Sequence, residues 1–216
     1  MNDFAVMILA AGQSSRLGHP KQLVEIQGET LLLKQCKMAL SITKHVYCVL
    51  GSNADTFKSH LKPLPINVVE NTAWEAGMSS SISCAIPLLP SSTKHVMIIL
   101  VDQWQLTKSL LIPFTQTLTT HKDKIITSSY SITGNTPANV VDKHASKIAN
   151  NHNLIGPPTI FPKKYFTALS SLSGEKGAKV LMVNEIKNVI QFPMPEAFVD
   201  LDNAHDLSKL RALFPC

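Results

Sequence analysis

The feature that most constrains the fold is a continuous apolar run, FAVMIL at residues 4–9, which passes directly into a loop of small residues. An uninterrupted apolar run of this length is typical of a strand buried on both faces of a parallel sheet. Similar runs stand at residues 45–50, 66–69 and 95–101, and amphipathic stretches lie near them at residues 30–40, 79–89 and 107–120. Strands that alternate with helices predict an α/β fold, with a mostly parallel sheet flanked by helices.

Capping and breaking residues mark the ends of these helices. Thr30 and Thr107 are placed to cap two of them at the N-terminus, and Ser79 is a candidate cap of a third. Pro87 and Pro90 are expected to end the helix that begins near Ser79.

The second half of the chain has a weaker pattern. Residues 130–141 predict a β-hairpin around Gly134-Asn135, and we interpret residues 127–158 as an insertion around a site rather than a second domain. Near the end, residues 198–202 predict a short strand and residues 204–213 a closing helix.

Composition excludes several classes of protein. The net charge of +5 comes with only 16% charged and 6% aromatic residues, and no Lys/Arg run is interleaved with aromatics, so nucleic-acid binding is not expected. The four cysteines are far apart and contain no C-x-x-C pair, which predicts reduced thiols. The N-terminal apolar stretch is shorter than the roughly 20 residues of a membrane span and follows no basic segment. We therefore expect a cytoplasmic protein.

Residues 9–21, LAAGQSSRLGHPK, carry the strongest chemical signal. Successive backbone N–H groups in a turn of small residues form an anion-binding concavity, and Gly12 and Gly18 can adopt positive φ. Arg16 and Lys21 can add a planar fork and a point charge for phosphate oxygens. The loop thus predicts a polyphosphate site, although its spacing matches neither G-x-x-x-x-G-K-[ST] nor G-x-G-x-x-G.

This string resembles the signature L-A-[AG]-G-x-x-x-R-x-G-x-x-K of nucleotidyltransferases with a GT-A-like Rossmann fold, and within them the MobA-like family. Residues 71–82 are similar to the family's N-x-x-W-x-x-G-M-x-x-S segment, residues 173–179 to its G-D-x-G-A-R, and residues 200–207 to its D-I-D-T-P-E-D-L. The matches run from residue 4 to about 210. The resemblance implies a single Rossmann-like domain over residues 1–216, with a nucleotide-binding half at about 1–125 and acceptor-binding and closing elements at about 126–216.

The resemblance also implies roles for individual residues. It assigns nucleotide binding to Leu9, Ala10, Ala11, Gly12, Gly77, Ser81 and Asp102, and catalysis to Arg16, Lys21 and Asp102. In this group an Ala-Ala-Gly loop accompanies cytidine nucleotides, so Ala11 favours CTP over GTP. The extra methyl takes room that a purine needs, although one methyl discriminates by only about 1–3 kcal/mol.

Three carboxylates are candidate ligands of Mg²⁺. Asp102 follows a buried strand at its carboxyl end, where open α/β sheets place ligands, and Mg²⁺ prefers one or two carboxylates plus substrate phosphates. Asp200 and Asp202 are alternatives for a second contact, because alternation along a strand sends both to one face. Asp200 is slightly preferred. Asp206 is expected to face solvent on the closing helix.

The sequence departs from the family pattern in two places. The family's D-Q-P reads Asp102-Gln103-Trp104 here, and we expect Trp104 to fill part of the acceptor cleft. Glu175 and Lys179 stand where the family has Asp and Arg, and a lysine cannot reproduce the bidentate phosphate binding of an arginine.

The reaction implied by the resemblance is transfer of CMP from CTP to the phosphate of Mo-molybdopterin, with a xanthine dehydrogenase-type enzyme as the client. Two alternatives stay open. One is a cytidylyl- or uridylyltransferase for a sugar or polyol phosphate, and the other is a non-catalytic maturation chaperone that binds nucleotide or pterin.

Overall fold

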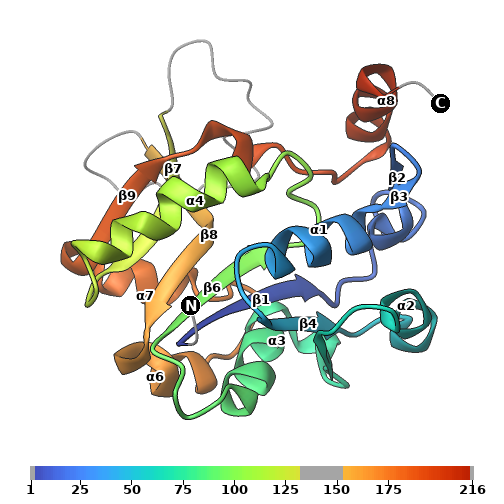
Figure 1. The fold of residues 1–216 in the computed structure, drawn as a ribbon. Helices are drawn as coiled ribbons and strands as arrows, with labels where there is room; N and C mark the ends of the chain where they lie inside the picture. The colour runs from blue at the N-terminus through green and yellow to red at the C-terminus, as the bar shows by residue number, and fades with distance from the viewer. Residues whose placement is uncertain (1–2, 132–152, 215–216) are drawn as a thin grey trace.

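The computed structural model describes residues 3–131 and 153–214, and at its centre lies a seven-stranded sheet in the order β5-β4-β1-β6-β8-β7-β9 (Figure 1). Its strands are β1 (Phe4–Ala10), β4 (His45–Leu50), β5 (Asn67–Glu70), β6 (His95–Leu100), β7 (Ile125–Ser131), β8 (Asn153–Pro162) and β9 (Val189–Pro193). Neighbouring strands are parallel except around β8, which runs antiparallel to β6 and β7. The predicted α/β class, with its mostly parallel sheet, is confirmed.

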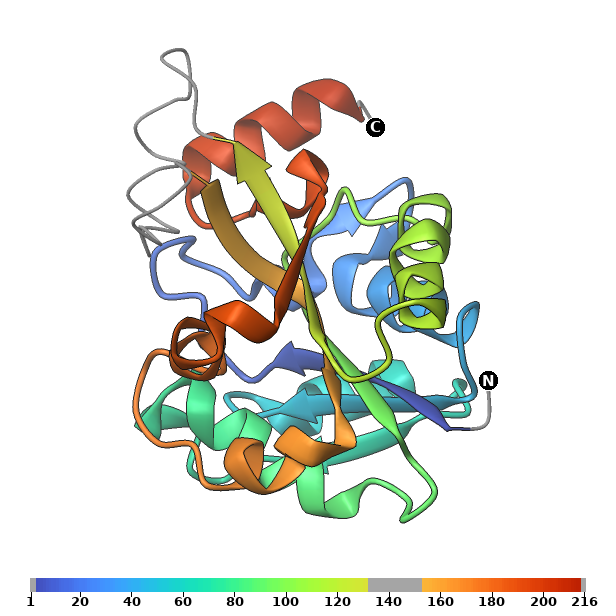
Figure 2. The same ribbon diagram turned by 90° about the vertical axis from the view of Figure 1, so that its left-hand side faces the viewer.

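Helices cover both faces of this sheet (Figure 2). They are α1 (Leu31–Leu40), α2 (Ala54–Leu61), α3 (Met78–Ala85), α4 (Lys108–Gln116), α6 (Phe166–Ser170) and α7 (Lys179–Asn184). A further helix, α8 (Ala204–Leu213), packs in a separate cluster, and a small antiparallel pair, β2 (Glu25–Ile26) and β3 (Glu29–Thr30), precedes α1. Within the described ranges, no helix combines the length and the apolar character that crossing a membrane requires.

The alternation of side chains along β1 explains the two helical layers. Its even-numbered residues, 4–10, pack in one core cluster with α1, α2 and α4. Its odd-numbered residues, 5–9, pack in a second cluster with α3, α6 and α7. Successive strand side chains point to opposite faces, so a strand covered on both sides must be apolar throughout. This burial accounts for the continuous run at the start of the chain.

The predicted helix caps are confirmed at two of three positions. Thr30 and Thr107 each accept a hydrogen bond through the hydroxyl oxygen from a backbone N–H three residues on, at 3.4 Å. The expectation for Ser79 is wrong, because α3 begins one residue earlier, at Met78, with Gly77 in the N-cap position. This helix ends at Ala85, ahead of the two prolines.

The segment at residues 127–158 is not only an insertion, because β7 and the start of β8 are strands of the central sheet. β7 buries polar side chains after the apolar Ile125 and Ile126, and these polar groups are satisfied: the Thr127 and Ser128 hydroxyls donate to the Gly156 carbonyl at 2.8 and 2.7 Å. A buried strand that carries bonded hydroxyls lacks the apolar signal by which strands are recognised. The hairpin expected around Gly134-Asn135 lies outside the described residues.

The predicted closing helix is confirmed as α8, but the short strand before it is wrong. Residues 195–198 form a 3₁₀ helix, and residues 199–202 pair with no strand. The backbone N–H groups of Asp202 and Asn203 donate instead to the Asp206 carboxylate at 3.0 and 3.2 Å, in a capping box. Asp206 therefore holds the entry to α8, contrary to the expectation that it faces solvent.

Candidate active site

Two cavities open where the carboxyl ends of β1 and β6 lie side by side. They have volumes of about 390 and 430 Å³, and here they are called the first and the second cavity. Both are lined by Leu9, Lys21, Met78, Leu100, Asp102 and Glu175. The cavities therefore share a wall that contains one cation and two carboxylates.

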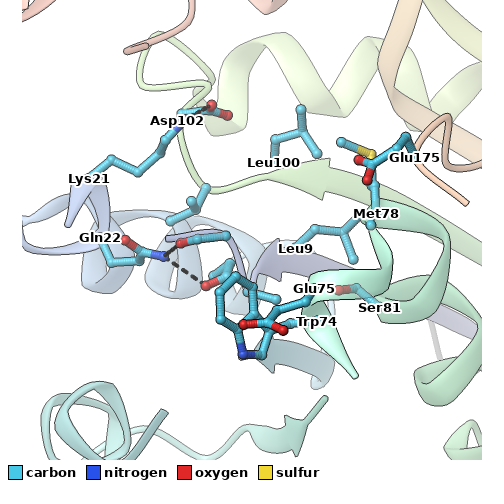
Figure 3. Close-up of a pocket in the computed structure, with 15 residues that line it drawn as sticks. Leu9, Lys21, Gln22, Trp74, Glu75, Met78, Ser81, Leu100, Asp102 and Glu175 are labelled. Atoms are coloured by element: carbon cyan, nitrogen blue, oxygen red, sulfur yellow. Dashed lines mark hydrogen bonds and ion pairs between the residues drawn. The ribbon is translucent and has the colours of Figure 1, made fainter. Parts of the chain in front are cut away.

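Most residues that the sequence assigns to the site meet at these cavities. Those lining the first cavity are Leu9, Ala10, Ala11, Gly12, Lys21, Gly77, Ser81 and Asp102, several of which appear in Figure 3. Asp200 and Asp202 line the second cavity. Arg16 is exposed and lines neither cavity. Ser81 is buried, and its hydroxyl oxygen accepts a hydrogen bond from the Asn71 amide at 3.0 Å.

Lys21 joins two of the predicted carboxylates. Its ammonium lies 2.6 Å from Asp102 Oδ2 and 3.1 Å from Asp202 Oδ1, and Figure 3 shows Lys21 and Asp102 directed toward one another. Burial alone would lower the pKa of Lys21, but attraction and hydrogen bonds to Asp102, and then to Asp202, raise it above its ordinary value. Lys21 therefore keeps its positive charge throughout the neutral range.

The second oxygen of Asp102 suits a cation. Asp102 Oδ1 is buried and has no hydrogen-bond partner, which is costly for a carboxylate unless a ligand takes it up. Among the described residues no three His, Cys, Asp or Glu side chains group into a metal cage. Mg²⁺ does not need one, because it is usually held by one or two carboxylates together with substrate phosphates. The buried Oδ1 atom of Asp102 therefore suits a Mg²⁺ ion.

Gln22, which the sequence analysis did not single out, holds the loop after β1. Its side-chain amide is buried and donates to the Ala10 carbonyl at 2.8 Å and the Gly12 carbonyl at 3.0 Å, as the dashed lines in Figure 3 show. The amide thus occupies the carbonyls of the loop, and Ser14 Oγ accepts the N–H of Lys21 at 3.1 Å. Only the position of Gln22 directly after Lys21 hints at this role in the sequence.

A close approach of Trp74 to Gly51 shapes the first cavity. A Cβ atom on Gly51, at the end of β4, would lie 2.5 Å from Trp74 Cβ and 2.8 Å from the Ala11 carbonyl oxygen. The Ser52 N–H also donates to that carbonyl at 3.0 Å. Glycine at this position lets Trp74 reach the cavity wall beside Ala11 (Figure 3).

The loop at residues 174–179 is docked on the N-terminus of α3. The Ser79 N–H donates to the Gly174 carbonyl at 3.2 Å. Gly77 has φ +96°, and a Cβ there would lie 2.9 Å from the Cα of Glu175 and from the Gly174 oxygen. Docking places Glu175 in both cavities and Lys179 in the second. Burial, and then repulsion by Lys176, lower the pKa of Lys179.

The second cavity is mostly apolar, and Trp104 is not part of it. Its apolar lining includes Ile82, Ile98, Ile155, Phe161 and Met182. The expectation that Trp104 fills the acceptor cleft is wrong. Its ring is buried in a separate group, the Trp104 cluster, formed by Leu17, Val24, Ile26, Leu31, Trp104, Leu201, Leu207 and Leu210. The indole packs against apolar side chains of the first loop and of α8, and it does not reach the cavity.

Comparison with known proteins gives a family model and several similar structures. A family model described as a MobA-like NTP transferase domain matches residues 6–189. A protein named as probable molybdenum cofactor guanylyltransferase from Trichormus variabilis is 45% identical over 49 residues, which are 23% of this chain and 24% of that protein. The chain is thus matched over about a quarter of the length of this curated relative.

Two solved structures are similar over nearly their whole length. The structure of Rv0371c from Mycobacterium tuberculosis H37Rv has a TM-score of 0.74 and 21% identity, covering 97% of each chain. Its homologue from Mycobacterium sp. strain JC1 has a TM-score of 0.74 and 25% identity, covering 99% of this chain and 98% of the other. The path of the chain described above therefore recurs in solved proteins.

Proposed function

The chain belongs to the MobA-like NTP transferase family, and from this premise we propose that it transfers CMP from CTP to the phosphate of Mo-molybdopterin. The products are pyrophosphate and molybdopterin cytosine dinucleotide. The observation that supports this transfer is the shared wall, because Lys21 and Asp102 line both cavities. The CMP group that moves from one bound substrate to the other must contact residues that line both cavities.

The residues at this wall suit nucleotidyl transfer without a general base. An oxygen of the acceptor phosphate, already an anion at neutral pH, attacks the α-phosphorus of CTP. The bond from that phosphorus to the bridging oxygen breaks, and pyrophosphate leaves with the electron pair. Catalysis then consists of positioning and charge neutralisation, which Lys21 supplies as a permanent cation. A Mg²⁺ ion held by Asp102, with Asp202 or Asp200, supplies further neutralisation of the triphosphate.

The preference for CTP rests on Ala11. Ala11 is 7% exposed, and it lines the first cavity between Ala10 and Gly12. Its methyl group reduces the room for a purine base. Ala11→Gly is therefore expected to increase the use of GTP relative to CTP by about tenfold, within the range that one methyl supports. Unchanged preference in Ala11→Gly would remove the argument for CTP.

The preference for a pterin over a polyol rests on the lining of the second cavity. Eight large apolar side chains line it, beside the charged groups of the same cavity, and they offer more apolar surface than the hydroxyls of a sugar or polyol can use. Lys176 and Lys179 lie at the same cavity and supply positive charge for an acceptor phosphate. The proposed protein partner is a xanthine dehydrogenase-type client that receives the product.

Asp102→Asn tests the proposal against a chaperone role. An enzyme is expected to lose pyrophosphate release by about 10²-fold or more, because the variant removes charge at the transferring group. The matched control is Asp55→Asn, whose carboxylate on α2 is 98% exposed and lines neither of the two cavities. If Asp102→Asn still matured the client fully, and if neither this variant nor the wild type showed turnover, the chaperone role would replace the enzyme proposal.

A further inference from the structure

Lys21 and the two carboxylates that it pairs with, Asp102 and Asp202, stand on segments outside the strands of the central sheet. Lys21 lies in a 3₁₀ turn, Asp102 in the turn after β6, and Asp202 in the segment before α8, which belongs to none of the described strands. In Figure 1, α8 stands beside β2 and β3, away from the helices that cover the sheet. Something other than strand pairing must therefore fix Asp202 relative to Lys21.

The Trp104 cluster supplies an apolar partner next to each of these groups. Val24 follows Lys21 by three residues, Trp104 follows Asp102 by two, and Leu201 directly precedes Asp202. Each is at most 8% exposed. The cluster is thus built from the same three segments that carry the cation and the two carboxylates.

Trp104 occupies the position in this cluster that links the Asp102 turn to α8. Its N–H donates to the Asp102 carbonyl at 2.9 Å, so its backbone belongs to the turn. Its indole meets the Phe214 ring, at the end of α8, edge to face at a centroid distance of 6.0 Å and an angle of 87°. Such ring pairs contribute beyond the area they bury.

We propose that Trp104 is a positioning residue, which anchors α8 and thereby holds Asp202 against Lys21 and Asp102. A proline, which the family pattern has at this position, would stiffen the turn but offer no ring to α8. Displacement of Asp202 by about 1 Å is enough to lower turnover strongly, because charge neutralisation depends on position. The inference rests on the proposed function for its kinetic readout only.

The test compares Trp104→Leu with Trp104→Phe and with a matched control. The control is Phe114→Leu, which removes a buried ring that meets Phe192 edge to face at 5.5 Å, far from the site. Trp104→Leu is expected to lower kcat about tenfold or more, with the KM for CTP changed less than about threefold, and to raise the Mg²⁺ concentration at half-maximal rate. Trp104→Phe should restore most of the rate, and Phe114→Leu should lose stability alone.

Hydrogen exchange gives a readout that does not need turnover. In Trp104→Leu, the N–H groups of Asp202 and Asn203 should exchange faster than in Phe114→Leu at equal loss of melting temperature, since they depend on the entry to α8. Equal exchange in the two variants, or a Trp104→Leu variant with normal kcat and Mg²⁺ requirement, would overturn the inference. A wild-type protein without turnover would instead contradict the proposed function and leave exchange to decide on Trp104.

Discussion

Lys21 and Gln22 are consecutive residues with opposite tasks at the site. Lys21 is directed toward Asp102 and Asp202 at the shared wall, whereas Gln22 turns its amide to the backbone carbonyls of the first loop. A short 3₁₀ turn makes this division possible, because it sends neighbouring side chains in different directions. One turn of chain therefore positions both the Lys21 ammonium and the loop after β1.

Gln22→Ala is expected to weaken nucleotide binding more than it lowers kcat. The variant leaves the Ala10 and Gly12 carbonyls without their donor, which costs roughly 1–3 kcal/mol of unfolding free energy and loosens the loop. Steady-state kinetics should show a higher KM for CTP. Thr43→Val is the control, since the Thr43 hydroxyl donates to the Phe4 carbonyl at the other end of β1. If both variants changed KM equally, the role of Gln22 in the loop would be refuted.

The lowered pKa of Lys179 predicts a pH effect on acceptor binding. Because burial and Lys176 lower this pKa, the positive charge of Lys179 is lost as pH rises through a value below that of an ordinary lysine. The KM for the acceptor should therefore rise at alkaline pH, while Lys21, whose pKa is raised, stays charged. Lys176→Gln should move the rise to higher pH, and Lys62→Gln, just after α2, should not. A KM that is independent of pH up to the ordinary lysine pKa would contradict this assignment.

At the scale of elements, loops rather than strands bring the two cavities together. The segment at residues 174–179 reaches the site only because it docks on the start of α3 through Gly77. The end of β6 is tied to the second half of the chain by Gln103, whose amide donates to the carbonyls of Pro157 at 2.5 Å and Ala197 at 2.7 Å. These contacts join the first half of the chain to the second at the two cavities.

Two glycines test the docking of this loop. Gly77 and Gly174 both have positive φ, +96° and +81°, so alanine is strained through the backbone at either position, and more so at Gly77, whose ψ of 179° lies in a region that is essentially restricted to glycine. Only at Gly77 does the new Cβ also meet the opposing backbone, whereas nothing lies within 4 Å at Gly174. Gly77→Ala should thus lower the urea midpoint further and raise the KM for the acceptor. Equal effects of the two variants would show that the close approach is unimportant.

Elements that are recognised by local pattern could be predicted from the sequence, and those that depend on distant partners could not. β1, β4 and β6 are apolar because both faces are covered, and their pattern is visible in single segments. After Ile125 and Ile126, β7 carries buried hydroxyls that bond to β8, so its burial leaves no continuous apolar run. The predicted strand at residues 198–202 failed because its first residue ends a 3₁₀ helix and the N–H of its last residue, Asp202, donates to the Asp206 carboxylate.

On the scale of the whole molecule, the site joins a first loop that the sequence identifies with contacts that only the folded chain creates. The motif at residues 9–21 indicates phosphate chemistry, and the structure brings Lys21 to Asp102 across 81 positions of sequence and to Asp202 across 181. No local pattern encodes such pairs. The direction of Trp104, away from the acceptor cavity, likewise follows from the packing of α8 and not from its neighbours in sequence.

The central claim is that one wall between two cavities serves CMP transfer, and pyrophosphate release tests it most directly. Purified protein with Mg²⁺ and Mo-molybdopterin is supplied with CTP, GTP, ATP or UTP in parallel, each with and without the acceptor. The account predicts release with CTP only, and only when the acceptor is present. Release with GTP in place of CTP would overturn the assignment of the base, and release from no nucleotide with any phosphorylated acceptor would contradict the account itself.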